Sequence, residues 1–224
     1  MTTQEMLMLF QENRDSIKAK AMAAYQKNQF DFYGIQTPLR RQLSKAFLKD
    51  KAAVEEIDWD FIMAMWQENY RECQYLACDY LRQSRVKKRL TVSDLAKLKQ
   101  LIVTKSWWDS VDSLDEIVGS IVKRYPEAKR QILDWSLADN FWLRRIAIDH
   151  QLGFKEETDR HLLAKVIENN LQGSDFDNEF FINKAIGWSL RDYSKTAPDW
   201  VALFIEEHRN QMAPLSIREA SKYL

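Results

Sequence analysis

Three segments of the chain carry side chains whose types and spacing suit chemistry on a cationic or phosphate-bearing ligand. The first is SWWDSVD at 106–112. Trp108 and Asp112 are four residues apart and share one helical face, whereas Trp107 and Asp109 turn about 100° away. A carboxylate beside an indole attracts a cation through its charge and through the ring quadrupole. The alternative is that both tryptophans pack in the core and both aspartates are solvated or capping.

The other two segments add positive charge. In WLRRIAI at 142–148, the adjacent Arg144 and Arg145 cannot point the same way, so one faces outward to a phosphate or an acid and the other pairs within the fold. In FFINKAIGWSLRDYSK at 180–195, Lys184 and Arg191 lie on the same helical side as Trp188. An aromatic ring among cations suits stacking on a sugar or base with phosphates nearby. A core tryptophan with solvated surface charges is the alternative.

Composition and motifs argue against several other classes of protein. His150, His161 and His208 are scattered and form no HExxH pair, and the chain has no P-loop, GxGxxG or GxSxG pattern, so we expect no metal or nucleotide cofactor. Cys73 and Cys78 lack metal-site spacing and are expected to be reduced thiols. The absence of an apolar leader and of any long apolar run predicts a cytoplasmic protein without a membrane partner.

The charge balance sets a condition on any nucleic-acid partner. The 33 lysines and arginines equal the 33 aspartates and glutamates, and the isoelectric point is near 6.8. Binding to DNA is dominated by phosphate neutralisation. The cations must therefore be segregated onto one face if the chain binds DNA.

Helical signals recur along the whole chain. With only 5 glycines and 4 prolines, an all-β fold is disfavoured. We expect about twelve helices, with start signals at Thr37-Pro38, Asp58, Thr91 with Asp94, Thr196 to Asp199, and Ser216 to Glu219. Every second helix opens on aromatics followed by polar residues. The aromatics Tyr70, Trp107, Trp142 and Phe181 are 37, 35 and 39 residues apart, and 214–224 resembles a truncated last copy.

This period is typical of stacked antiparallel helix pairs of HEAT type. One pair cannot bury its apolar face alone, so successive pairs share a continuous core. Equivalent residues of successive second helices then become neighbours on one face. We therefore predict a single all-α HEAT-like repeat domain over residues 1–224, built of about six helix pairs. A non-repeating helical bundle is the alternative.

In combination, SWWDSVD, WLRRIAIDHQL and FFINKAIGWSLRDYS closely resemble the AlkD-like DNA alkylation repair glycosylases of bacteria, and FYGIQTPLRRQLSKAF at 32–47 resembles their N-terminal segment. The resemblance covers nearly the whole chain. It implies a right-handed superhelix whose concave face binds double-stranded DNA. It also implies hydrolysis of the N-glycosidic bond of cationic N3- or N7-alkylated purines without base flipping.

The resemblance also assigns residues. It implies Asp112 as the catalytic carboxylate, with the indoles of Trp108 and Trp188 beside the sugar. Arg145 is the implied cationic contact, or Arg144 if the alignment slips by one position. Lys184, Arg191 and Arg218 are the further expected DNA contacts. No lysine nucleophile is required, so we expect a monofunctional, monomeric glycosylase without a cofactor.

Two other functions stay open at this point. One is a non-catalytic HEAT-like protein that binds unusual DNA structures, and the other is a protein-binding helical scaffold. The nucleic-acid hypotheses require the cations to share a face; these are Arg40, Arg41, Arg71, Arg145, Lys184, Arg191 and Arg218.

Overall fold

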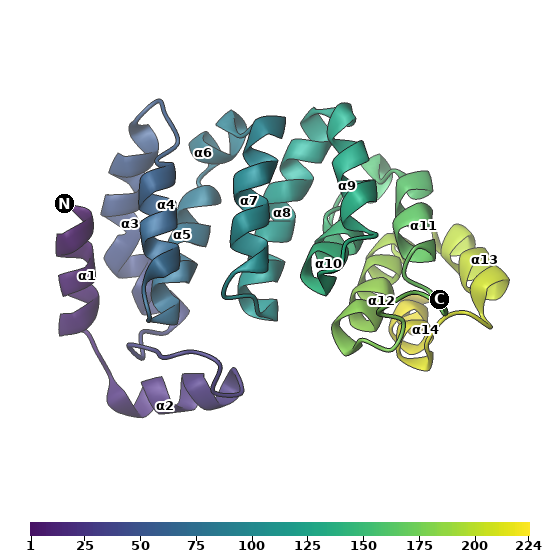
Figure 1. The fold of residues 1–224 in the computed structure, drawn as a ribbon, viewed down its shortest axis with the longest axis horizontal. Coiled ribbons are helices and arrows are strands. Elements are labelled where there is room, and N and C mark those ends of the chain that lie inside the picture. Colours follow the sequence, from purple (N-terminus) through teal and green to yellow (C-terminus); the bar gives the residue numbers. More distant parts are fainter. The chain divides into compact units, whose positions relative to one another are not determined.

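The computed structural model describes residues 1–224 and consists of helices joined by turns and loops (Figure 1). It contains fourteen α-helices and four short 3₁₀ turns. The only β-type pairing is an isolated bridge between Asp31 and Tyr70. The chain divides into two compact units, residues 1–90 and residues 91–224. The all-α class predicted from the sequence is therefore confirmed, with two more helices than expected.

Unit 1 contains the first six helices. They are α1 (Thr3–Glu12), α2 (Ser16–Tyr25), α3 (Thr37–Ala53), α4 (Trp59–Gln67), α5 (Arg71–Leu81) and α6 (Ser84–Arg89). Helix α5 is the centre of this unit: it packs on α3, α4 and α6, and nearly all of its side chains are buried. One of them, the Glu72 carboxylate, accepts backbone N–H bonds from Tyr33, Gly34 and Ile35 at 2.9–3.0 Å. It thereby fixes the loop that leads into α3.

Unit 2 contains the other eight helices and carries all three segments singled out above. Its helices are α7 (Leu95–Val103), α8 (Trp108–Arg124), α9 (Lys129–Trp135), α10 (Phe141–Asp149), α11 (Arg160–Glu168), α12 (Phe180–Ser194), α13 (Pro198–His208) and α14 (Pro214–Ala220). The 3₁₀ turns η1 (Val92–Asp94), η2 (Pro126–Ala128), η3 (Lys155–Glu157) and η4 (Ser221–Tyr223) also lie in this unit. Its core is formed by aliphatic side chains that the helices bury between them.

The predicted neighbour relation between second helices is present in unit 2. Helix α8 packs on α10, α10 on α12, and α12 on α14. In addition, α8 packs on α7, α10 packs on α9 and α11, and α12 packs on α13. Two glycines permit close approach. A Cβ on Gly119 would lie 2.0 Å from the His150 carbonyl oxygen, and one on Gly187 would lie 2.5 Å from the Glu219 Cβ. Residues about 35 positions apart are thus brought side by side.

Some of the helix starts predicted from the sequence are present in the structure, and others are not. Asp58 caps α4 by accepting from the Phe61 N–H at 2.8 Å, and Thr91 and Asp94 form the expected capping box. The start at Thr37 is wrong by one residue, because Gln36 is the N-cap and Thr37 is already helical. The predicted cap at Thr196 is wrong, because α13 begins at Pro198 after Ala197.

The predicted cap at Ser216 is wrong in a more informative way. Ser216 lies inside α14, which begins at Pro214, and its hydroxyl donates to the Asn183 carbonyl oxygen at 2.9 Å. Glu219 is likewise buried inside the helix and forms ion pairs with α12. A spacing that resembled a capping box therefore marks the contact between α12 and α14.

Two further expectations concern the whole chain. None of the helices combines the length and the apolar character that crossing a membrane requires. Cys73 and Cys78 are both buried thiols, as expected. The single domain and the right-handed superhelix stay predictions.

Candidate active site

A carboxylate and a guanidinium from two neighbouring helices form the centre of the site. Asp112 lies on the second turn of α8, and Arg145 lies on α10. The Arg145 Nε and Nη2 donate to the two Asp112 carboxylate oxygens, each at 2.8 Å. The Arg145 side chain is 2% exposed and that of Asp112 is 24% exposed. Arg145 thus fixes the carboxylate from behind while the carboxylate itself reaches solvent.

The aromatic residues that open α8, α10 and α12 hold these helices in register. Trp107, the N-cap of α8, packs edge-on against Trp142 and Phe181, with ring centroids 6.1 and 5.5 Å away. The backbone of α12 also takes part directly, because Arg145 Nη1 donates to the Phe181 carbonyl oxygen at 2.7 Å. Trp107, Trp142 and Phe181 therefore hold the helices that carry Asp112 and Arg145, and they are not themselves part of the site.

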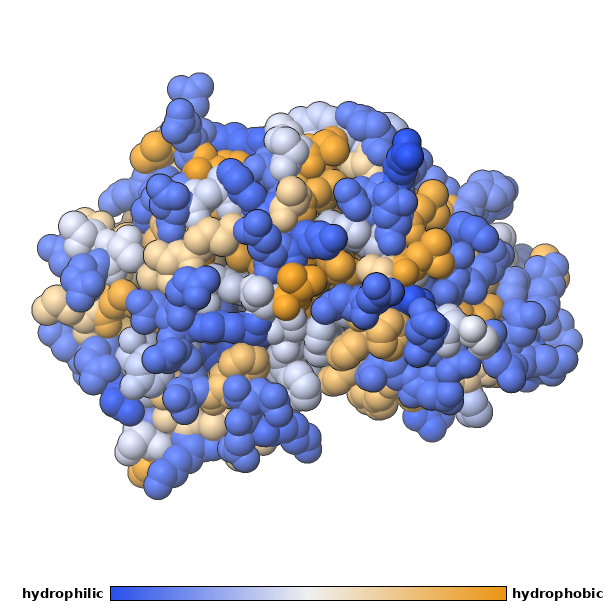
Figure 2. Space-filling model, viewed as in Figure 1, coloured by the Kyte–Doolittle hydropathy of each residue, from blue (hydrophilic) through white to orange (hydrophobic).

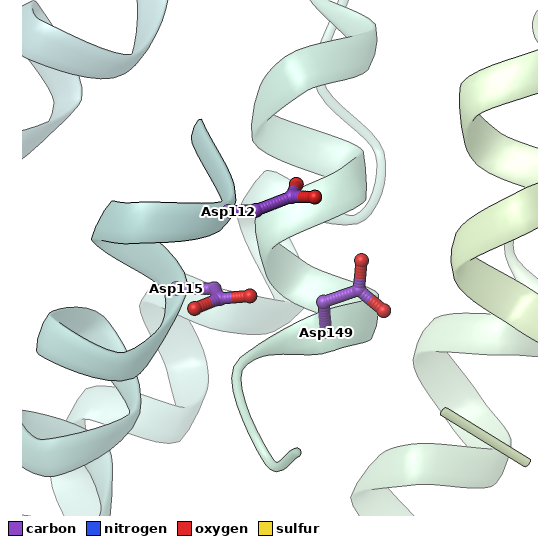
Figure 3. A group of neighbouring side chains, drawn as sticks. All are labelled: Asp112, Asp115 and Asp149. Atoms are coloured by element: carbon purple, nitrogen blue, oxygen red, sulfur yellow. The ribbon is translucent and has the colours of Figure 1, made fainter. Parts of the chain in front are cut away.

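Two more aspartates lie behind the pair. The carboxylate oxygens of Asp112, Asp115 and Asp149 come within 4.8 Å of one another, and the three side chains converge from α8 and α10 (Figure 3). Asp149 Oδ2 is 3.6 Å from Arg145 Nη2, and its Oδ1 accepts from the Ser189 hydroxyl at 2.9 Å. Asp115 accepts the backbone N–H of Glu116. Three carboxyl groups thus face a single guanidinium.

This imbalance changes the acid–base properties of the buried groups. Burial raises the pKa of Asp149 to about 6 against the opposing effect of Arg145, and the charge of Asp112 adds to the rise. Burial and the charges of Asp149 and Asp112 raise the pKa of Asp115 well above its usual range. Although burial works against it, the charges of Asp149 and Asp112 raise the pKa of Arg145. The guanidinium therefore stays charged.

Such oxygen atoms are of the type that binds hard metal ions. Arg145 donates to both oxygens of Asp112 and Ser189 donates to Asp149 Oδ1, while Asp149 Oδ2 accepts no hydrogen bond and lies 3.6 Å from Arg145 Nη2. The donors of Arg145 and Ser189 thus link Asp112 and Asp149 in one hydrogen-bonded network.

An indole ring lies beside the guanidinium of Arg145. The Arg145 guanidinium is 5.4 Å from the centroid of the Trp188 ring, and Lys184 Nζ and Arg191 Cζ are 5.5 and 5.9 Å from it. Trp188 is half-buried on α12. Trp108 is also half-buried and begins α8, one helical turn before Asp112. The structure therefore brings Arg145 into contact with both Asp112 and Trp188, and the roles that the resemblance implies for these residues stay predictions.

Comparison of the sequence and the structure with known proteins identifies the family of this chain. A sequence model of the family described as "DNA alkylation repair enzyme" matches residues 6–224. The chain belongs to the DNA alkylation repair enzyme family. A solved structure described as "Predicted DNA alkylation repair enzyme from Enterococcus faecalis" is 39% identical, with a TM-score of 0.85, and the match covers 94% of this chain and 96% of that one. No curated protein matches the chain.

Within this member of the DNA alkylation repair family, the choice between the two adjacent arginines is resolved. Arg144 points away from Asp112: its guanidinium donates to the Ala138 carbonyl oxygen at 2.6 Å and to Asp175 at 2.9 Å, and its side chain is 3% exposed. Partners within the fold therefore hold the Arg144 guanidinium, and its contact with DNA stays a prediction. Arg145 is also buried, but it donates its hydrogen bonds to Asp112, the candidate catalytic carboxylate.

The remaining predicted DNA contacts lie on helices α12 and α14 of unit 2. Lys184 and Arg191 reach the buried Glu219 carboxylate at 3.0 and 3.1 Å, and Lys222 reaches it at 2.7 Å. The hydrogen bonds from Lys222 and Lys184 lower the pKa of Glu219 to about 2. Arg218 is exposed. Lys184 and Arg191 therefore stay partly exposed, while Glu219 holds them beside the Trp188 ring.

The nucleic-acid hypotheses required seven cations to share a face, and three of the seven are buried: Arg40, Arg71 and Arg145. Arg40 is buried in an ion pair with Asp79 at 3.1 Å. Arg71 is fully buried, with its guanidinium 3.8 Å from the centroid of the Phe30 ring. These two arginines stabilise unit 1 and are not available to a partner.

Sequence reasoning missed Asp149, Ser189 and Glu219. One signal for the first was present, because Asp149 follows Arg145 by four residues and so shares its helical face. Ser189 adjoins Trp188 in sequence but turns toward α10. Glu219 was assigned to a cap. Each of these residues acts through a contact with a helix about one repeat away.

Proposed function

We propose that the protein is a monofunctional DNA glycosylase that hydrolyses the N-glycosidic bond of cationic N3- or N7-alkylated purines in double-stranded DNA without base flipping. The observation that carries this proposal is the partly exposed Asp112 carboxylate, oriented by both N–H donors of the Arg145 fork beside the Trp188 ring. Membership of the DNA alkylation repair family supports it.

The chemistry fits the charge of the site. An alkylated purine is already cationic, so cleavage of its C1′–N bond returns the electron pair to the ring and releases a neutral base. Positive charge then develops on the deoxyribose. A preorganised carboxylate stabilises that charge, and it also orients the water that attacks C1′ and takes up its proton. Asp112 is the group placed for these roles.

The indoles and cations have separate roles in this proposal. Trp108 and Trp188 present ring faces to the sugar, where developing positive charge is attracted by the ring quadrupole. Lys184, Arg191 and Arg218 contact phosphates on either side, and the duplex lies against the row formed by α8, α10, α12 and α14. Because no lysine acts as nucleophile, the product is an abasic site in an intact strand.

The test uses duplex DNA that has been methylated and then incubated with the wild-type protein. We expect free 7-methylguanine and 3-methyladenine in the supernatant, and strand breaks only after alkali treatment. Breaks without alkali would contradict the monofunctional mechanism. Release of no base under any condition would contradict the glycosylase itself.

One observation favours a second function. Both oxygens of Asp112 already accept hydrogen bonds from Arg145, so a water at Asp112 must share an oxygen with the guanidinium. A non-catalytic protein that binds unusual DNA structures would also retain this pair. Salt-dependent binding to branched or damaged duplexes, together with no base release, would identify that function.

A further inference from the structure

The buried layer behind Asp112 contains more charge than its orientation requires. The Arg145 fork alone fixes both oxygens of Asp112, and its remaining nitrogen, Nη1, donates to the Phe181 carbonyl oxygen. Asp149 adds no hydrogen bond to this arrangement, because its Oδ2 accepts none and lies 3.6 Å from Arg145 Nη2. A buried carboxylate that is incompletely hydrogen-bonded costs free energy. Asp149 must therefore contribute something other than the geometry of the fork.

The position of Asp149 is fixed from α12. The Ser189 hydroxyl lies 2.9 Å from Asp149 Oδ1 and 2.9 Å from the Ile148 carbonyl oxygen, so it reaches α10 at the point where that helix ends. Ser189 directly follows Trp188, whose ring lies 5.4 Å from the Arg145 guanidinium. The same turn of α12 therefore fixes the carboxylate and the indole on the two neighbours of one cation.

Three charged groups face Asp149. They are Arg145 on its own helix and Asp112 and Asp115 on α8, which converge with it in Figure 3. The next residue, His150, turns its Nδ1 to the Ala147 carbonyl oxygen, and burial lowers its pKa to about 4, so its ring is neutral at pH 7. Arg145 is thus the only cation of this cluster.

Cations on the other helices around α10 have other partners. On α12, Lys184 and Arg191 pair with Glu219. On α7, α9 and α11, every ionisable side chain is exposed except Lys129, which pairs with Asp159. No second cation therefore balances Asp149.

The net charge of the cluster depends on a single proton. Burial, followed by the charges of Asp149 and Asp112, raises the pKa of Asp115 well above its usual range, so Asp115 keeps its proton when Asp149 ionises. With Asp149 protonated, the charges of Asp112 and Arg145 cancel. With Asp149 ionised, one net negative charge remains. Burial raises the pKa of Asp149 to about 6, so the ionised form predominates at pH 7.

We propose that Asp149, ionised and held by Ser189, is a positioning residue for base release that offsets the charge of Arg145, so that the fork orients Asp112 without cancelling its negative charge. The inference rests on the proposed function, in which positive charge develops on the deoxyribose. A guanidinium behind the carboxylate opposes that charge, and a second carboxylate behind the guanidinium compensates for it.

Burial makes this compensation effective. Hydrophilic residues cover most of the face drawn in Figure 2, and charges on such a surface are screened by water and salt. Asp149 and Arg145 are each 1% exposed, so their charges are screened much less. A unit charge about 8–10 Å from the reacting carbon, at an effective dielectric constant of about 20, changes a rate by about 10-fold.

The test is the pH profile of 7-methylguanine release, from about pH 4.5 to about pH 7.5, in single turnover with saturating protein and after subtraction of release without protein. We expect the wild-type rate to rise by about 10-fold as the pH increases through about 6, because Asp149 ionises in this range. Asp149→Asn is permanently neutral and keeps an oxygen for Ser189. It should lose this rise and stay near the rate that the wild type shows at low pH.

Two further variants distinguish this role from a structural one. Ser189→Ala removes a hydroxyl that lowers the pKa of Asp149, so the rise should move to higher pH. Asp134→Asn removes the same charge from an exposed position on α9, a helix that packs on α10 and carries no residue of the site, and it should keep the wild-type profile. Because ionised Asp149 is unfavourable for folding, Asp149→Asn should be at least as stable as wild type at pH 7, so unfolding would not explain a lower rate.

The outcomes separate this inference from the glycosylase proposal. If the wild type releases base and Asp149→Asn keeps the same rise with pH, whether or not its rate is lower throughout, the role of Asp149 is wrong and the glycosylase stands. A rise that disappears in Asp134→Asn as well would also overturn it, because the effect would then belong to total charge. If the wild type releases no base at any pH, both proposals are wrong.

Discussion

Asp149 is the residue at which burial and charge oppose each other within the site. It is 1% exposed, receives one hydrogen bond from Ser189, and has only a 3.6 Å contact with the guanidinium that Asp112 holds at 2.8 Å. An ionised carboxylate in such surroundings costs free energy unless its partner is close. The Arg145 guanidinium therefore interacts more closely with Asp112 than with Asp149, and the closer interaction orients Asp112.

A pH dependence of stability follows from the raised pKa of Asp149, about 6 in the folded protein against a usual value of 3.8. Because the folded state holds this proton more tightly, the group's contribution to stability is complete below about pH 4 and is lost as the pH rises through about 6. The loss amounts to roughly 3 kcal/mol. Asp149→Asn mimics the protonated group and keeps an oxygen for Ser189. We therefore expect the variant to gain stability relative to wild type as the pH rises from 4 to 7.

Urea unfolding of both proteins at several pH values measures this difference. Ser189→Ala serves as a second variant, because its hydroxyl lowers the pKa of Asp149. Its loss should move the change in stability to higher pH. Parallel pH profiles for wild type and Asp149→Asn would contradict the account of this network.

At the scale of elements, the contact between α12 and α14 supports the Trp188 side of the site. Glu219 of α14 holds Lys184 and Arg191 of α12, and the two helices meet where Gly187 has no side chain. The Ser216 hydroxyl adds a bond to the Asn183 carbonyl oxygen. The position of the indole therefore depends on how closely the last helix approaches.

Gly187→Ala tests this dependence. Its Cβ would lie 2.5 Å from the Glu219 Cβ and 3.2 Å from the Ser216 carbonyl oxygen, so α14 must move away. Overpacking of this kind costs about 1–3 kcal/mol, and we expect base release to fall because Lys184 and Arg191 lose their anchor. In the control Gly153→Ala, the added Cβ meets nothing within 4 Å, although its φ of +79° costs roughly 1 kcal/mol. Equal stability losses combined with unchanged base release in Gly187→Ala would contradict this role of α14.

Elements were more predictable than the contacts between them. The aromatic starts at Tyr70, Trp107, Trp142 and Phe181 correctly identified α5, α8, α10 and α12, because burial of such rings at each repeat leaves a strong periodic signal. The partner of Arg144 could not be found in this way, since Asp175 lies in a loop that has no periodicity. Glu219 was missed because a capping box and a buried ion pair share the same local spacing.

At the scale of the whole molecule, net charge was a poor guide to a nucleic-acid partner. The neutral total and the isoelectric point near 6.8 average a basic unit 1 with an acidic unit 2. The acidic excess in unit 2 includes Asp112, whose charge the proposed function uses to stabilise the developing cation.

The most direct test of the central claim is the rate of 7-methylguanine release by Asp112→Asn, measured in single turnover with enzyme in excess over alkylated duplex. Asparagine keeps the size of the side chain and one acceptor for Arg145, but it removes the charge. Electrostatic stabilisation of this kind contributes about 10²–10³ in rate, so we expect release at least about 100-fold slower, with DNA binding and circular dichroism like those of wild type. Release at the wild-type rate would contradict the assignment of Asp112 and, with it, the proposed mechanism.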